Sequence, residues 1–80
     1  MQLRSEIVEL MMRFARQIAA HEALVAEATQ CVELLEPMGD KRCKKILQET
    51  ITARRREISD MRGTIARLAD LLADMPIETI

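Results

Sequence analysis

The sequence predicts an all-α fold: an antiparallel, coiled-coil-like hairpin of two long helices that pairs as a dimer into a four-helix bundle. Three observations lead to this prediction. Helix-favouring residues dominate the 80-residue chain, which has one aromatic residue, two glycines and two prolines. Apolar residues recur at heptad spacing in two stretches of similar length. A short segment containing Pro37 and Gly39 separates the two stretches and predicts a turn.

The first helix is expected over about residues 3–36. Read in sevens, its apolar residues fall into three adjacent columns, whereas the seam between two helices needs only two. This wide face predicts that the helix has more than one partner. The columns are Ile7, Phe14, His21, Ala28 and Leu35; then Leu10, Gln17, Leu24 and Cys31; then Met11, Ile18, Val25 and Val32.

The turn is expected at residues 37–40. Pro37 stops the first helix, Gly39 permits a left-handed conformation, and Asp40 is a good N-cap for the second helix. The second helix is expected over about residues 41–75, followed by a tail of residues 76–80. Its apolar columns are Ile51, Ile58, Ile65 and Leu72, and Leu47, Arg54, Met61, Leu68 and Met75.

Residues 1–80 are expected to form a single domain with a thin core, which is marginally stable without a partner. A two-helix hairpin cannot cover the three-column face of its first helix. A homodimer is therefore the default expectation, and the alternative is a hairpin that completes its core on a different protein. Residues 1–36 carry a net charge of −3 and residues 40–62 a net charge of +4, which favours packing of the two arms.

Polar residues interrupt both stripes at the same height. His21 and Gln17 do so in the first helix and Arg54 in the second. One interpretation is a polar layer that fixes the register or receives a partner. The other is that Arg54 reaches solvent while His21 bonds a neighbour. No metal is expected here, because the chain has one histidine and no Glu-x-x-His spacing.

The sequence has no pattern that indicates catalysis. It lacks a nucleophile beside a base, a Cys-x-x-Cys pair and a glycine-rich phosphate loop, so we expect neither an enzyme nor a bound cofactor. Cys31 is expected in the core, and Cys43 lies near a helix N-terminus, where a thiolate is favoured. In the expected register Cys31 faces Ile46, which argues against a disulfide between the two cysteines.

Composition also bounds the partners. The basic run at residues 54–56 lacks the aromatic platforms or groove-reading motif of a nucleic-acid interface, so direct binding to nucleic acid is not expected. No apolar run approaches the roughly 18–20 residues of a membrane span, and the start of the chain is charged rather than signal-like. A bacterial-type cytoplasmic protein is therefore expected.

Two stretches resemble a known family: Ile18-x-x-His21-x-x-Leu24-Val25-x-x-Ala28 with Leu35 and Pro37, and Thr64-Ile65-x-x-Leu68-x-x-Leu71-Leu72-x-x-x-Pro76. They are similar to the first and the C-terminal helix of TraM-type quorum-sensing anti-activators. The likeness covers roughly residues 10–76, and Ile51 stands where that family carries an aromatic residue. It implies a dimerising hairpin that binds a LuxR-type transcriptional activator and holds it off DNA.

The function expected from these observations is protein-binding regulation of transcription, as a quorum-sensing anti-activator. One alternative is a small helical chaperone of a secretion apparatus or effector, and another is a helical-hairpin inhibitor or dimerisation module. The residues expected at the partner or dimer interface combine stripe-edge apolar groups with the polar layer. They are Leu10, Phe14, His21, Leu24, Ile51, Arg54, Ile58 and Met61.

Overall fold

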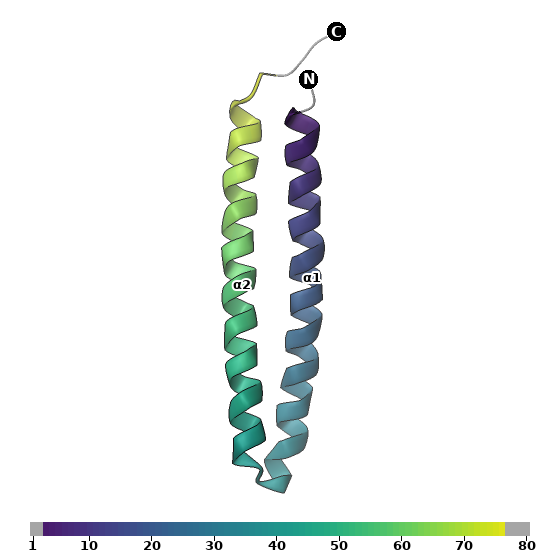
Figure 1. The fold of residues 1–80 in the computed structure, drawn as a ribbon, viewed down its shortest axis with the longest axis vertical. Helices are drawn as coiled ribbons and strands as arrows, with labels where there is room; N and C mark the ends of the chain where they lie inside the picture. The colour runs from purple at the N-terminus through teal and green to yellow at the C-terminus, as the bar shows by residue number, and fades with distance from the viewer. Residues whose placement is uncertain (1–2, 77–80) are drawn as a thin grey trace.

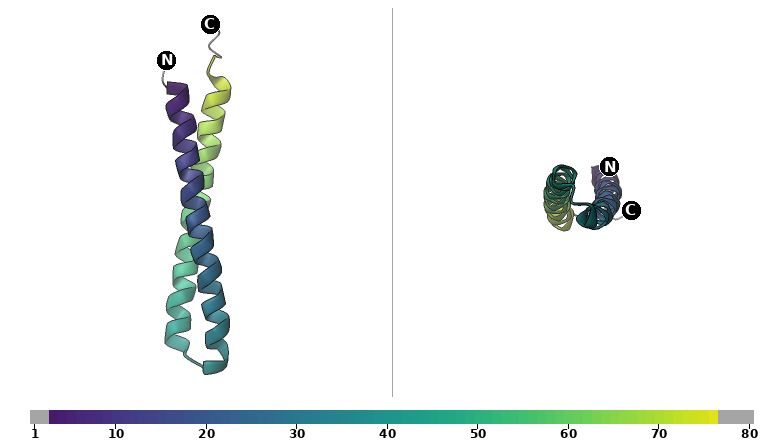
Figure 2. Two further views of the ribbon diagram at one scale, coloured as in Figure 1. Left: turned by 90° about the vertical axis from the view of Figure 1, so that its right-hand side faces the viewer. Right: turned by 90° about the horizontal axis from the view of Figure 1, so that it is seen from below.

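The computed structural model describes residues 3–76 and shows an antiparallel helical hairpin (Figure 1). Helix α1 covers Leu3–Leu35, a 3-10 turn η1 covers Glu36–Met38, and α2 covers Lys41–Asp74. The described residues contain no strand. The two helices, of 33 and 34 residues, lie side by side and form a rod about 50 Å long (Figures 1 and 2). The predicted hairpin is confirmed.

The seam between α1 and α2 uses two of the three columns predicted on α1 and both columns predicted on α2. Five side chains in it are buried: Ile7, Ile18, Ala28, Ile51 and Ile58. The other members of these columns are half-buried, because a single partner helix covers only one side of each of them. The heptad pattern therefore gives the correct packing faces.

The remaining column of α1 stays uncovered. Leu10, Gln17, Leu24 and Cys31 are all exposed, although three of them are apolar or weakly polar. The prediction that Cys31 is a core residue is therefore wrong for the hairpin, because its column lies beside the seam and not in it. Helix α1 thus carries more apolar surface than α2 covers.

The turn follows local chemistry. Helix α1 ends at Leu35, one residue before the expected end, and Pro37 lies in the 3-10 turn that follows. Gly39 has the expected left-handed conformation, with φ of 70°, and its N–H donates to the carbonyl of Leu35 at 3.1 Å. The Asp40 carboxylate accepts a hydrogen bond from the backbone N–H of Cys43 at 3.1 Å, which confirms the N-cap.

Helix α2 ends at Asp74, because Met75 adopts the extended conformation typical of a residue before proline. Of the expected tail of residues 76–80, only Pro76 lies among the described residues. Near this end the Arg4 guanidinium donates to the carbonyl of Leu72 at 3.3 Å, so the start of α1 lies beside the end of α2.

The core of the hairpin is thin. No side chain in the described part of the chain is less than 2% exposed. Neither helix has a stretch long and apolar enough to cross a membrane, as far as residues 3–76 are concerned. A fold with so little interior has little hydrophobic stabilisation of its own.

Candidate functional site

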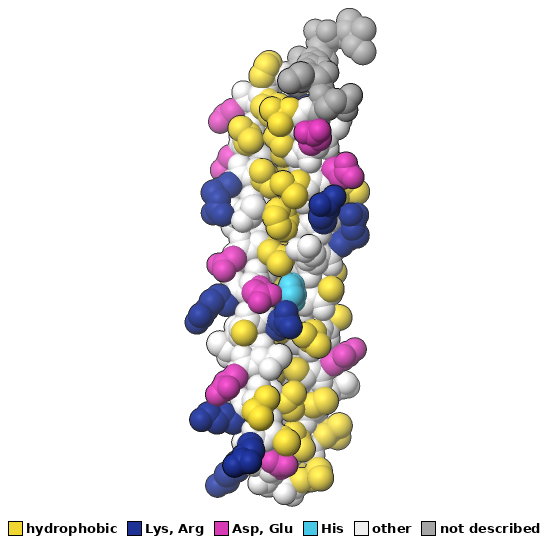
Figure 3. All heavy atoms as spheres, viewed as in Figure 1, with side chains coloured by type: hydrophobic (Ala, Val, Ile, Leu, Met, Phe, Trp, Pro, Cys, Tyr) yellow, Lys and Arg dark blue, Asp and Glu magenta, His cyan; other side chains and the backbone are white. Residues whose placement is uncertain are grey.

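One long side of the hairpin is apolar along most of its length. It flanks the seam with residues of both helices, and six of the nine large apolar residues that the structure leaves exposed lie on it. Figure 3 shows this stripe, interrupted near mid-length by the histidine and two charged neighbours. We call this surface the apolar side: Leu3, Leu10, Leu24, Cys31, Leu34, Cys43, Ile46 and Leu71.

The apolar side ends near the turn in a shallow groove with an entirely apolar lining. Its residues come from the last turns of α1 and the first turns of α2: Cys31, Leu34, Leu35, Cys43, Ile46 and Leu47. Leu34 is 72% exposed, and Ile46 across the groove is also more than half exposed. This groove holds the most exposed apolar side chains of this side.

A polar cluster of His21, Arg54 and Glu57 lies at mid-length. The Arg54 guanidinium is 3.5 Å from His21 Nδ1, and Glu57 Oε2 is 3.2 Å from His21 Nε2 and 3.4 Å from Arg54. A neutral imidazole with its proton on Nε2 satisfies this geometry, because it donates to Glu57 and accepts from Arg54. The exposed fractions of the three side chains are 18%, 38% and 48%, so the cluster is half open to solvent.

This cluster confirms that His21 and Arg54 meet in one layer, and it adds a residue that the sequence analysis missed. Glu57 completes the contact from α2. Its signal in the sequence is its position three residues after Arg54, which places both on neighbouring turns of one helix face. Gln17, expected in the same layer, is exposed one turn before His21.

The eight residues expected at the interface fall into three groups. Leu10 and Leu24 lie exposed on the apolar side, and His21 and Arg54 belong to the polar cluster. The other four pack in the seam: Phe14, Ile51, Ile58 and Met61. Ile51 and Ile58 are buried between the helices, so they support the exposed surface from behind.

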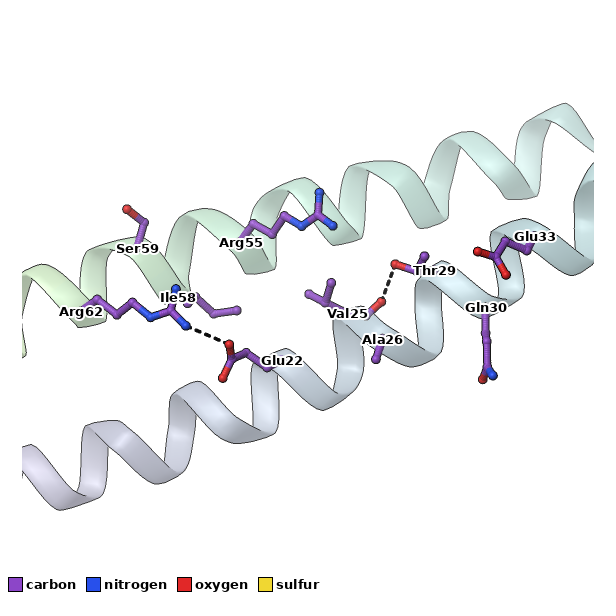
Figure 4. Close-up of a pocket in the computed structure, with 10 residues that line it drawn as sticks. All are labelled: Glu22, Val25, Ala26, Thr29, Gln30, Glu33, Arg55, Ile58, Ser59 and Arg62. Carbon is purple, nitrogen blue, oxygen red and sulfur yellow. Dashed lines mark hydrogen bonds and ion pairs between the residues drawn. The ribbon is translucent and has the colours of Figure 1, made fainter.

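The opposite side of the seam, on which Val8 is exposed near the start of α1, is polar over its middle. There the carboxylate of Glu22 pairs with Arg62 at 2.8 Å, and the two side chains are more than half exposed (Figure 4). Arg55 and Glu33 line the same open groove. Thr29 donates its hydroxyl proton to the carbonyl of Val25 at 2.8 Å, a bond within its own helix. The polar groups of this side are largely matched or in water, unlike the leucines of the other side.

Both cysteines are free and exposed, and both line the apolar groove near the turn. The hydrogen bond and the negative charge of Asp40 raise the pKa of the Cys43 thiol. The prediction that the helix N-terminus favours a Cys43 thiolate is therefore wrong, because the hydrogen bond and the charge of the capping carboxylate favour the thiol. The same cap lowers the pKa of Asp40, mainly through the backbone N–H of Cys43.

Potential metal ligands do not gather in the part of the chain that the structure describes: residues 3–76 contain no group of three or more histidine, cysteine or acidic side chains placed to hold an ion. Comparison of the chain with protein-family models, curated proteins and solved structures gives no match. Of the residues that carry the likeness to TraM-type proteins, His21 lies in the polar cluster, and Leu24 and Leu71 lie on the apolar side.

Proposed function

We propose that this protein is a non-enzymatic, protein-binding regulator: a quorum-sensing anti-activator that sequesters a LuxR-type transcriptional activator and blocks its DNA binding. The observation that supports this proposal is the apolar side, with six large apolar residues exposed along one side of a rod. A contiguous apolar surface of this kind marks a site of protein interaction. The partner class comes from the resemblance of the two helices to TraM-type proteins.

The proposed mode of binding is a helix laid along a groove. An amphipathic segment of the activator would place its apolar residues against Leu10, Leu24 and the groove near the turn. The His21–Arg54–Glu57 cluster would meet polar groups of the partner and so set the register of the complex. An activator held in this way would lose the surface with which it dimerises or meets DNA.

We also propose that the free chain pairs with a second copy. The hairpin has five buried side chains among its described residues, and small domains with so thin a core are usually completed by association. A four-helix bundle would cover the third column of α1. The same exposed side would thus be used in the homodimer and in the complex with the activator.

The test is binding of the purified protein to the LuxR-type activators of its host. We expect capture of one activator and loss of that activator's DNA binding in a mobility-shift assay. Leu24→Glu should weaken capture at least about tenfold, because a carboxylate would be buried without a partner. The matched control is Ala26→Glu, which adds the same charge to the polar side and should change the affinity less than about twofold.

Two results would contradict this function. Failure to bind any LuxR-type activator, with its DNA binding unaffected, would remove the proposed target. Equal losses from Leu24→Glu and Ala26→Glu would remove the apolar side as the binding surface. Specific co-purification of a secreted subunit would instead support the secretion-chaperone function.

A further inference from the structure

We infer that two copies pack through their apolar sides with both turns at the same end of the bundle, so that α1 of each copy lies opposite α2 of the other. The two polar clusters then meet in the middle of the bundle. This inference rests on the proposed protein-binding role of the apolar side. It adds the orientation of the second copy and the contacts that the second copy supplies.

The apolar side is large enough for a stable dimer. The helices are about 50 Å long, so one whole side of a rod 15 Å wide offers roughly 750 Å² per copy, within the about 600–1,000 Å² that a standard interface buries per partner. The opposite side would be a costlier contact, because Glu22, Arg55 and Arg62 along its edge would lose water. Contact through the apolar side desolvates mainly leucine, isoleucine and cysteine side chains.

The charges of the two helices select the orientation. Helix α1 has three arginines and five glutamates, a net charge of −2, whereas α2 has nine basic and five acidic residues, a net charge of +4. A two-fold axis along the rod puts α1, with its negative net charge, opposite the positively charged α2 of the second copy. A two-fold axis across the rod puts each helix opposite its own copy, so helices of the same net charge face each other. Complementary potentials favour the first arrangement.

The polar cluster favours the same arrangement. Glu57 lies at the middle of α2, so an axis across the rod would bring the Glu57 carboxylates of the two copies together. With both turns at one end, His21 instead comes to the height of Arg54 and Glu57 of the second copy, as it already does within its own chain. Arg54 and Glu57, which the single hairpin leaves half exposed, thereby gain partners.

The apolar residues near the turn match as well. Leu34 of α1 and Ile46 of α2 line one groove and therefore lie at the same height on the rod. When the turns are together, Leu34 of one copy faces Ile46 of the other, and the two grooves close on each other. These are among the most exposed apolar side chains of the hairpin, so this end gains the most from association.

Cross-linking of single-cysteine variants tests the orientation. Cys31→Ser leaves only Cys43, which lies about 20 Å along the helix from the middle of α2. With both turns at one end, the two Cys43 thiols project into one bundle end, where diagonal helices are about 14 Å apart. With the turns at opposite ends, the two thiols are about 40 Å apart. A bismaleimide of about 14 Å reach therefore distinguishes the two arrangements.

We expect most of the Cys31→Ser protein, and most of the Cys43→Ser protein, to run as a covalent dimer on a denaturing gel. Adding Leu24→Glu should abolish the cross-link, which shows that it does not arise from chance collisions. A dimer by sedimentation that gives no cross-link would overturn the orientation. A monomer at tens of micromolar would overturn the self-pairing. In both cases the binding of the LuxR-type activator, measured separately, still decides the proposed function.

Discussion

The two long sides of the hairpin flank the same seam but differ in the residues next to it. On one side these positions hold Leu10, Leu24 and Leu71, and on the other they hold Glu22 and Arg62. A hairpin that worked alone would place charges on both sides, as solvated coiled-coil flanks do. The seam determines the hairpin, and the difference between the flanks supports the proposal that one of them binds a partner.

The two sides also differ in the free energy that their side chains can contribute. The Glu22–Arg62 pair is more than half exposed, and such pairs contribute about 0.2–1 kcal/mol. Full burial of one leucine side chain contributes about 1.5–3 kcal/mol, so burial of the exposed parts of several leucines on the apolar side would stabilise an association more than this ion pair stabilises the hairpin. Four substitutions test this contrast.

The largest effect is expected from Ile58→Glu, because it disrupts the packing of the seam on which both sides of the hairpin depend. A carboxylate in this buried position costs several kcal/mol, which a hairpin with five buried side chains cannot absorb. Circular dichroism at 25 °C should show loss of most of the helix signal. Ser59→Glu, the next residue along α2, should keep it. A folded Ile58→Glu dimer would show that the seam has been assigned to the wrong face.

A matched pair of substitutions near the start of α1 isolates the two sides. Leu10 lies on the apolar side and Val8 on the opposite one, and the two have similar exposure. Leu10→Glu should weaken self-association at least about tenfold, because the charge enters the dimer interface. Val8→Glu should weaken it less than about threefold. Sedimentation equilibrium measures both constants, and equal losses would contradict the contrast between the sides.

His21→Ala sharpens the comparison within the apolar side. Its partners Arg54 and Glu57 are partly exposed, so the free energy of unfolding should fall by less than about 1 kcal/mol. The dissociation constants for self-association and for partner binding should change more, by about fivefold or above. Denaturant unfolding at fixed protein concentration and sedimentation give the two numbers. Glu22→Ala, which removes an ion pair on the polar side, is the control. An unchanged oligomer and partner profile in His21→Ala would leave His21 a packing role only.

The smallest effect is expected at the turn. Asp40→Asn keeps an N-capping side chain but removes the charge that raises the pKa of Cys43. Alkylation of Cys43 at pH 8 should therefore speed up by a few-fold, while Cys31 reacts at its former rate. Mass spectrometry after timed iodoacetamide treatment measures both rates. An unchanged alkylation rate at Cys43 would show that Asp40 does not control the reactivity of this thiol.

Asp40 also gives a pH dependence of known sign. Its pKa is lower in the folded chain than the ordinary value of 3.8, so the ionised cap stabilises the fold above that value. This stabilisation is lost as the pH falls through the folded pKa. The melting temperature of the native chain should thus drop more steeply below about pH 4 than that of Asp40→Asn.

Much of the fold could be predicted from the sequence because it depends on local rules. Heptad spacing placed Ile7, Ile18 and Ile58 in the seam, and the left-handed Gly39 and the Asp40 cap follow from turn chemistry. The excess apolar surface of α1 was also visible, since three columns are more than one helix can cover.

What could not be predicted depends on how one helix is rotated against the other. Heptad columns alone do not say which of two outer columns is left uncovered, so Cys31 was placed in the core when it lies beside it. The contact of Glu57 with His21 depends on the register of the two helices, which no local pattern around Glu57 indicates. The pKa of Cys43 depends on the hydrogen bond and the charge of Asp40, the N-cap three residues before it.

In the hairpin, the start of α1 and the end of α2 lie together at one end of the rod, opposite the turn (Figure 1). If the bundle has both turns at its other end, all four of these helix ends cluster, and a short flexible peptide can join two hairpins into a single polypeptide that folds as the complete bundle. A bundle with its turns at opposite ends would need a tether as long as the helices, about 50 Å. Gene duplication, or a fusion made at the bench, therefore has an easy route from this chain to a four-helix protein.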